Sequence, residues 1–87
     1  MQYFIKKGEF SMFLYQVINN TNETVIVSHA MMKAVNHAYI SIVHDNFKNI
    51  TVWKDGNIKG IITEDMLDEF KTRKSVLEEI KKIKNKK

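Results

Sequence analysis

The sequence predicts an α+β domain: a mainly antiparallel sheet of four to five strands with two helices on one face, in the order β-β-β-α-β-β-α. Two observations support this class. Short runs rich in aromatic and β-branched residues alternate with turn-forming residues, and two longer stretches have apolar residues at helical spacing. The 87 residues suffice for one hydrophobic core, so we expect a single domain over residues 1–87.

The first part of the chain is expected to form three strands. They are predicted at residues 2–6, 10–18 and 24–27, with turns at Gly8 and at residues 19–23. In the second strand Phe13 and Tyr15 point to one face while Leu14 points to the other, and both faces are apolar. This pattern is typical of a strand that is covered on both sides.

The first helix is expected to begin at Ser28, which is a favourable N-cap residue. The apolar stripe that it would bury has helical spacing and consists of Met31, Val35, Ala38 and Ile42. Residues 39–43 also have strand propensity, so the helix either continues through them or stops near Tyr39 and leaves a short extended piece. Residues 45–49 are expected to form a loop.

Residues 50–63, with the sequence ITVWKDGNIKGIIT, predict a β-hairpin with two alternative registers. A two-residue loop at Asp55 and Gly56 would place Val52 opposite Lys59, which mixes charged and apolar residues on one face. A three-residue loop with a left-handed Gly56 pairs Val52 with Ile58 instead, and we favour this register. It buries Ile50, Val52, Ile58, Gly60 and Ile62.

In the favoured register Trp53 pairs with Asn57 and points away from the buried isoleucines. We expect Trp53 either to be covered by the N-terminal strands or to be available to a partner.

The second helix is expected to begin after Thr63 and to run for about 20 residues as one amphipathic element. Its apolar stripe would consist of Met66, Leu67, Phe70, Val76, Leu77, Ile80 and Ile83. A helix of this length would extend beyond the core, so Leu77, Ile80 and Ile83 are expected to be partly free for a partner. Arg73 falls within the stripe, where it would lay its stem over the core or pair with a carboxylate.

An alternative places a break at Arg73 and Lys74, because Ser75 and Glu78 have the spacing of a capping box that starts a separate helix.

The positive charge is concentrated in the C-terminal segment. The net charge is +4, made of +6 for residues 71–87 and −2 for residues 1–70. Lys81, Lys82 and Lys84 therefore form the basic end of the second helix, which is suited to phosphate contacts. The abundance of Lys, Ile and Asn, with no Pro, is typical of AT-rich coding sequences and suggests a phage or mobile-element origin.

Little in the sequence points to catalysis or to a bound cofactor. There is no cysteine, and His29, His37 and His44 are spaced too far apart to share a metal ion. The acidic residues after Thr63 are explained by the helix macrodipole, and no nucleophile motif is present. We therefore expect no enzyme activity, metal, cofactor or small-molecule ligand. Without a spanning segment or signal peptide, no membrane association is expected and the predicted location is cytoplasmic.

Residues 52–67, VWKDGNIKGIITEDML, resemble the second half of a cystathionine-beta-synthase (CBS) domain, in which a strand, a D-G-x-hydrophobic-x-G-I-[IV]-T turn and strand, and a helix follow in order. The resemblance implies that Thr63 and either Asp65 or Asp68 contact the ribose of an adenine nucleotide. In that family the aspartate stands three residues after the threonine, where this chain has Met66. The resemblance covers about 20 of the 87 residues, and we do not assign the chain to that family.

The expected function is that of a non-enzymatic protein-interaction module, such as a phage or mobile-element accessory protein that binds or inhibits a host protein, or that binds a second copy of itself. The alternative is a sequence-nonspecific nucleic-acid-binding protein that uses the basic helix end and aromatic strand residues. Both hypotheses draw on the same candidate interaction residues, which are Trp53, Arg73, Phe13, Tyr15, Leu77, Ile80, Lys81, Lys82 and Lys84.

Overall fold

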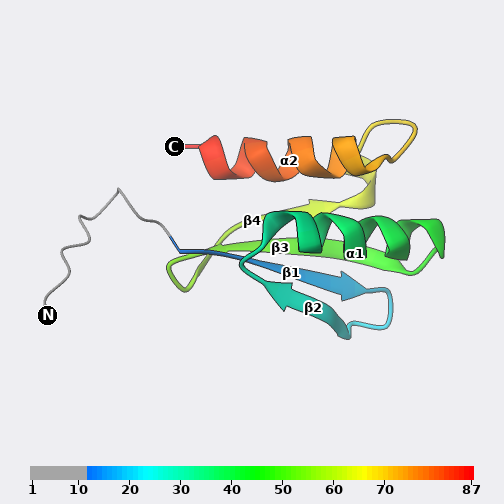
Figure 1. Ribbon diagram of the computed structural model, residues 1–87, viewed down its shortest axis with the longest axis horizontal. Helices are drawn as coiled ribbons and strands as arrows, with labels where there is room; N and C mark the ends of the chain where they lie inside the picture. The colour runs from blue at the N-terminus through cyan, green and yellow to red at the C-terminus, as the bar shows by residue number, and fades with distance from the viewer. Residues whose placement is uncertain (1–11) are drawn as a thin grey trace, which may run out of the picture.

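The computed structural model describes residues 12–87, which form a four-stranded sheet and two helices (Figure 1). In chain order the elements are β1 (Phe13–Asn19), β2 (Thr24–Ser28), α1 (Met31–Val43), β3 (Phe47–Lys54), β4 (Asn57–Thr63), the 3₁₀ turn η1 (Glu64–Met66) and α2 (Arg73–Asn85). The predicted α+β class is confirmed. The strand predicted at residues 2–6 and the turn predicted at Gly8 lie outside the described residues.

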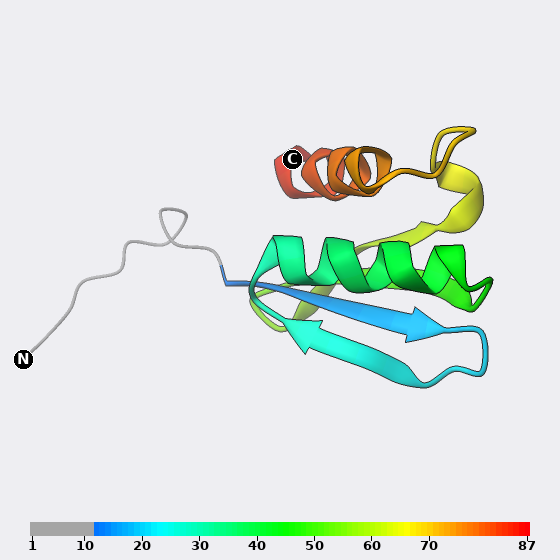
Figure 2. The ribbon, with the colours of Figure 1, turned by 45° about the vertical axis from the view of Figure 1, so that its right-hand side comes forward.

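The sheet is antiparallel throughout, with the strand order β2-β1-β3-β4. β1 and β2 form one hairpin, β3 and β4 form another, and α1 connects the two so that β3 returns beside β1. Both helices lie on the same face of the sheet, as predicted (Figures 1 and 2). α1 packs against β1, β2 and β3, whereas α2 packs against β4 and α1. Neither of these helices is long and apolar enough to cross a membrane.

One hydrophobic core lies between the sheet and the helices. Its most deeply buried side chains are Tyr15, Val17, Ile50, Val52 and Ile62 from the sheet, Ala34, Val35 and Ala38 from α1, and Val76 and Ile80 from α2. Full burial of one branched aliphatic side chain contributes roughly 1.5–3 kcal/mol. This layer therefore holds both helices against the sheet.

The predicted start of the first helix is wrong by two residues. The N-cap position is occupied by Ala30, whose backbone N–H donates to Ser28 Oγ at 2.9 Å, so Ser28 organises the turn before the helix. Residues 39–43 are helical, which excludes the shorter alternative. The buried side of α1 includes the small side chains of Ala34 and Ser41, while the predicted Met31 and Ile42 are only partly buried at the edge of the core.

The predicted loop at residues 45–49 is also too long, because β3 already begins at Phe47, whose ring is buried.

The register predicted for the β3–β4 hairpin is wrong at the turn. Lys54 pairs with Asn57 across a two-residue loop in which Asp55 and Gly56 both have positive φ, at 52° and 85°. This is the arrangement of a type I′ turn, whose twist matches that of the flanking strands. Lys59 is then an extra, unpaired residue, since Trp53 pairs with Ile58 while Val52 pairs with Gly60.

The bulge at Lys59 reverses the predicted side of one isoleucine. Ile50, Val52 and Ile62 are fully buried, as predicted, and Gly60 lies on their face against Ile83. Ile58, by contrast, is 54% exposed and faces the other way, beside Trp53. A two-residue loop without a bulge would have placed Val52 opposite Lys59. The bulge places Val52 opposite Gly60 instead, so charged and apolar residues are not mixed on that face.

The single long helix predicted after Thr63 is also wrong, and the alternative with a break is nearer to the structure. Thr63 caps only the short η1 turn, and the chain leaves helical geometry at Leu67, which is buried. α2 begins at Arg73 with Thr72 as its N-cap, where Thr72 Oγ1 accepts a hydrogen bond from the Ser75 N–H at 3.2 Å. The cap is therefore Thr72 rather than Ser75.

The second helix does not protrude from the domain. α2 has 13 residues, which corresponds to a length of about 20 Å at 1.5 Å per residue. Phe70, which the long helix would have placed in its apolar stripe, is 81% exposed in the connecting loop.

Candidate functional site

The sheet face opposite the helices carries apolar side chains on all four strands. We call this surface the open face; it consists of Leu14, Gln16, Ile18, Val25, Val27, Asn49, Thr51, Trp53, Ile58, Ile61 and Thr63. None of these residues is charged. Val25, Val27, Ile58 and Ile61 are 40–54% exposed in the described structure, so water contacts branched aliphatic carbon along both edge strands of this face, β2 and β4.

The indole of Trp53 has a fixed position on the open face. Trp53 Nε1 donates a hydrogen bond to Gln16 Oε1 at 3.2 Å, and Gln16 Nε2 donates to Thr24 Oγ1 at 2.8 Å. This relay connects the side chains of β3, β1 and β2. Trp53 points away from the buried isoleucines, as predicted, and it is half-buried among its neighbours.

A second feature is a pocket of about 290 Å³ at the end of the sheet where β1 begins. We call it the Phe13 pocket; its lining residues are Met12, Phe13, Tyr15, His29 and Lys84. The Phe13 carbonyl can only accept a hydrogen bond, so His29 Nδ1 donates to it at 2.7 Å. Four separate segments meet here: β1, the β2–α1 connection, the β3–β4 hairpin and the end of α2 (Figure 1).

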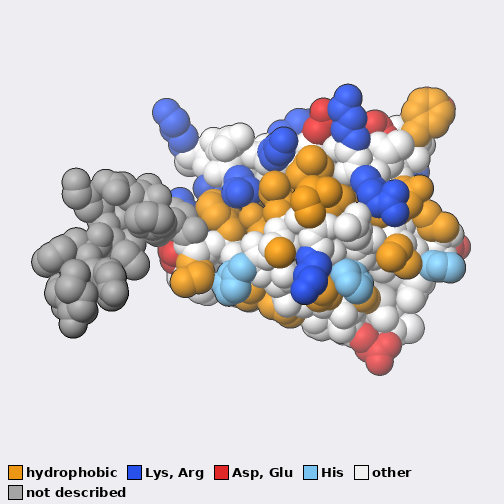
Figure 3. Space-filling model, in the orientation of Figure 1, with side chains coloured by type: hydrophobic (Ala, Val, Ile, Leu, Met, Phe, Trp, Pro, Cys, Tyr) orange, Lys and Arg blue, Asp and Glu red, His pale blue; other side chains and the backbone are white. Residues whose placement is uncertain are grey.

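Three lysines surround the Phe13 ring. Their Nζ atoms lie 5.0 Å (Lys84), 5.8 Å (Lys54) and 6.0 Å (Lys59) from the ring centroid, within the range of cation–π attraction. Lys59 Nζ also donates to the Lys86 carbonyl at 2.8 Å, which ties the hairpin to the end of α2. Figure 3 shows further Lys and Arg side chains gathered along α2.

Two of the predicted interaction residues are core residues instead. Tyr15 is 1% exposed and Ile80 is fully buried. Tyr15 points to the helix side of β1, and Ile80 faces the sheet because the shorter α2 lies entirely on the domain. Leu77 and Ile83 are partly buried and pack against the same core, so of the three residues expected to be partly free for a partner, Ile80 is not free at all.

Arg73 lies at the exposed start of α2 rather than within its apolar stripe. Its Nε donates to Asn36 Oδ1 at 3.0 Å, and its guanidinium carbon lies 4.2 Å from the centroid of the Tyr39 ring. The arginine therefore stacks on an aromatic ring and binds an amide, in place of the predicted carboxylate partner. These contacts join α2 to α1.

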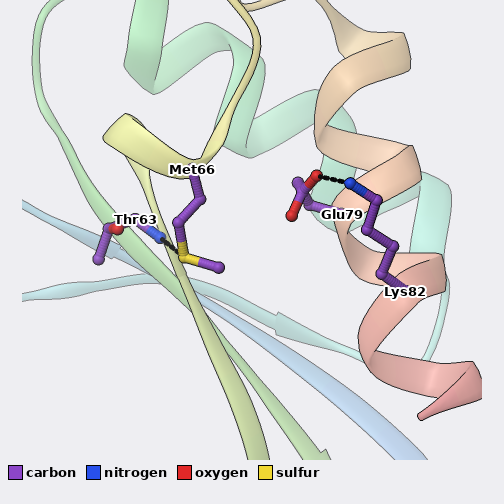
Figure 4. A network of polar contacts seen from close by, with 4 residues as sticks. All are labelled: Thr63, Met66, Glu79 and Lys82. Carbon is purple, nitrogen blue, oxygen red and sulfur yellow. Dashed lines mark hydrogen bonds and ion pairs between the residues drawn. The ribbon is translucent and has the colours of Figure 1, made fainter.

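Lys81, Lys82 and Lys84 have different surroundings. Lys81 is exposed, whereas Lys84 lines the Phe13 pocket. Lys82 Nζ lies 2.8 Å from Glu79 Oε2 (Figure 4), and the hydrogen bond and charge of Glu79 raise the pKa of Lys82 above its ordinary value. Of the three, only Lys84 is placed beside an aromatic ring.

The residues implied by the CBS resemblance make contacts with one another and with nearby backbone. Thr63 Oγ1 donates to Asp65 Oδ1, and the Thr63 N–H donates to Met66 Sδ at 3.4 Å (Figure 4). Asp68 Oδ1 accepts from the Lys71 N–H at 3.1 Å. These are the capping contacts that η1 and the following turn require. Within residues 12–87, no three His, Asp or Glu side chains are placed to share a metal ion.

Sequence reasoning missed several residues of both features. On the open face it missed Ile58, because the bulge at Lys59 cannot be read from the alternation of residues. Around the Phe13 pocket it missed His29 of the β2–α1 connection, and Lys54 and Lys59 of the β3–β4 hairpin, whose ammonium groups lie beside the Phe13 ring. The DG dipeptide, a strong signal for a two-residue turn, was the available clue to the hairpin register.

Comparisons of the chain with protein-family models, with curated proteins and with solved structures gave no match.

Proposed function

We propose that this chain is a non-enzymatic protein-interaction module that docks on a partner protein through its open face. The observation that carries the proposal is the exposure of uncharged aliphatic residues on both edge strands of the open face, Val25 and Val27 on β2 and Ile58 and Ile61 on β4, with Trp53 between them on β3. An antiparallel sheet that faces water on one side normally presents polar residues there. Exposed aliphatic residues gathered on one face are instead typical of an interaction site.

The size of the open face favours a reversible contact. Four strands about 4.8 Å apart, with about six residues each at roughly 3.3 Å per residue, cover a footprint of about 400 Å². This is about half of what one partner contributes to an interface of standard size. We therefore infer a transient partner whose surface is apolar and uncharged, rather than an obligate second copy.

A binding role fits these features better than a catalytic one. An aliphatic sheet face contributes through burial, which has no chemical step, and Trp53 is an amphipathic anchor of the kind enriched at interfaces. A role in binding or inhibiting a host protein, a phage or mobile-element origin and a cytoplasmic location stay predictions that rest on the sequence.

The proposal is tested with two isoleucines of similar exposure on opposite sides of the domain. Ile61 on the open face is 45% exposed, and Ile40 on α1 is 49% exposed. We expect Ile61→Lys to abolish capture of the partner from source-cell extract, whereas Ile40→Lys retains it. The captured protein, once purified, should protect Trp53 from acrylamide quenching, because Trp53 is the only tryptophan of the chain.

Two outcomes contradict the proposal. If the wild type and Ile61→Lys capture the same proteins, the open face is not the docking surface. If sedimentation instead shows a dimer that Ile61→Lys dissociates, the occupant of the open face is a second copy and not another protein.

A further inference from the structure

Positive charge is concentrated around the Phe13 ring, at the Phe13 pocket and outside the open face. The Nζ atoms of Lys54, Lys59 and Lys84 all lie within 6.0 Å of one ring centroid, so their potentials add over the same small volume. Within residues 12–87, none of the three has a carboxylate at ion-pair distance. The repulsion between these ammonium groups would be relieved by an anion bound among them.

The chemistry of the pocket favours a phosphate group attached to an apolar or aromatic moiety. Lysine ammonium groups are point charges with several donors, which suits a phosphate oxygen approached from different directions. Phe13 and Met12 provide an apolar wall beside them, and His29 adds an imidazole. Aromatic rings flanked by lysines are the combination with which proteins bind unpaired bases and their backbone.

The surroundings of the pocket favour a strand over a free phosphate. Beyond Lys84, α2 ends at Asn85 and the chain continues with Lys86 and Lys87, while Lys81 is exposed one turn before Lys84. A basic track that leads away from a pocket can contact successive phosphates of one chain. The single arginine of the sequence is engaged with Asn36 and Tyr39, so the usual agent of base-specific readout is not part of this track.

We infer that the Phe13 pocket binds single-stranded nucleic acid without sequence specificity, with one phosphate held among Lys54, Lys59 and Lys84 and an adjacent base against Phe13. The site is separate from the proposed protein-docking surface. The Phe13 ring, with the lysines around it, lies on the helix side of the sheet, and Trp53 lies on the other side.

The test is fluorescence anisotropy of a labelled oligothymidylate of about ten nucleotides, a length within the usual range of single-stranded binding sites. Measurements use the full chain at 50 and 200 mM salt. Three phosphate contacts on a single strand predict a slope of about −2 in log K against log salt, which is roughly a 20-fold loss of affinity over this range.

The variant Lys84→Gln is compared with Lys74→Gln, which makes the same charge change at the exposed start of the same helix. We expect Lys84→Gln to weaken binding about 5-fold or more and to reduce the salt slope by roughly 1, while Lys74→Gln changes both much less. Phe13→Leu retains an apolar side chain and should weaken binding about 5-fold or more, with the slope unchanged, because it removes stacking and not charge. Circular dichroism melting verifies that each variant is folded.

Three results would overturn the inference. The first is no binding of the oligonucleotide at 50 mM salt. The second is an equal loss of affinity in Lys84→Gln and Lys74→Gln, which would show that binding depends on the overall positive charge and not on the Phe13 pocket. The third is competition by inorganic phosphate as effective as that by the oligonucleotide, which would assign the pocket to a free anion. The open-face variant Ile61→Lys should bind the oligonucleotide like the wild type, so this test and that of the proposed function fail separately.

Discussion

The two faces of the sheet are built from similar residues but meet different surroundings. Ile61 and Ile62 are neighbours in β4, yet Ile62 is fully buried under the helices while Ile61 is 45% exposed on the open face. On β1, Tyr15 and Val17 are buried while the intervening Gln16 serves the Trp53 relay. The difference shows that side-chain type does not decide which face becomes the core. The position of α1 and α2 decides it.

The largest expected effect separates the two isoleucines. Ile62→Ala should lower the free energy of unfolding by about 3 kcal/mol, because it leaves a cavity in the core, whereas Ile61→Ala should cost less than about 1 kcal/mol. Urea titration of both variants measures the difference. Equal losses would mean that the open face is covered in solution, and the comparison between the faces would fail.

The contact between α2 and β4 is expected to be the tightest point of the covered face. A Cβ added at Gly60 would lie 2.8 Å from Ile83 Cδ1 and 3.0 Å from two further Ile83 carbons. Gly60→Ala should therefore destabilise the protein by about 2 kcal/mol, since the helix or the side chain has to shift. The same change in an Ile83→Ala background should cost clearly less in a urea titration. An undiminished cost would point to the backbone of β4 instead of the overlying helix.

The attachment of α2 also depends on its N-cap. Thr72→Ala removes the acceptor for the Ser75 N–H and should destabilise the protein by about 1 kcal/mol. Thr72→Ser keeps a hydroxyl at the same place and is the matched control, which should lose only a fraction of that amount. Thermal melting of the pair measures the cap. Similar losses in both variants would trace the effect to the lost methyl group.

On the open face, the hydrogen bond between Trp53 and Gln16 should contribute little to stability. Gln16→Met removes the acceptor but keeps the length of the side chain, and the expected cost is about 0.5 kcal/mol because water can replace the lost partner. Fluorescence should report greater quenching of Trp53 by acrylamide as the indole becomes mobile. Unchanged quenching would show that packing alone orients the ring.

The smallest effect is expected at the surface of α2, far from either face of the sheet. Glu79 raises the pKa of Lys82, so their attraction is present below the ordinary lysine pKa and is lost as the pH rises through the raised value. Lys82→Gln should change the melting temperature little at neutral pH, because the lysine is fully exposed. The difference from wild type should vanish once the pH exceeds the raised pKa of Lys82, and a difference that persists there would have another cause.

The fold class and much of the core were predictable because they depend on periodicity. Ile50, Val52 and Ile62 were correctly placed in the core, and Trp53 on the opposite side. The break before α2 was considered only as an alternative, because the segment between Leu67 and Thr72 contains neither glycine nor proline. It ends the helix through buried Leu67, through a left-handed Lys71 with φ of 49° and through the Thr72 cap. These features can be recognised as a helix break only once the packing of the core is known.

The candidate sites were less predictable than the fold. The sequence predicted both helices on one face of the sheet, but the composition of the opposite face depends on the bulge that turns Ile58 outward. The Phe13 pocket depends on long-range contacts: Phe13, the hairpin lysines Lys54 and Lys59, and Lys84 come from three parts of the chain that are distant in sequence. Charge patterning located the basic helix end, while the aromatic ring it meets could be found only from the tertiary structure.

The bulge in β4 makes Lys59 separable from the rest of the hairpin. Ile58 pairs with Trp53 and Gly60 pairs with Val52, so the residues on either side of Lys59 already face consecutive positions of β3. If Lys59 were deleted, every other β4 residue that pairs with β3 would keep its partner. Loss of a single codon would thus subtract one cation from beside Phe13 while preserving the ladder and the open face. The positive charge that Lys59 places beside Phe13 can therefore be gained or lost by a single insertion or deletion that leaves the fold unchanged.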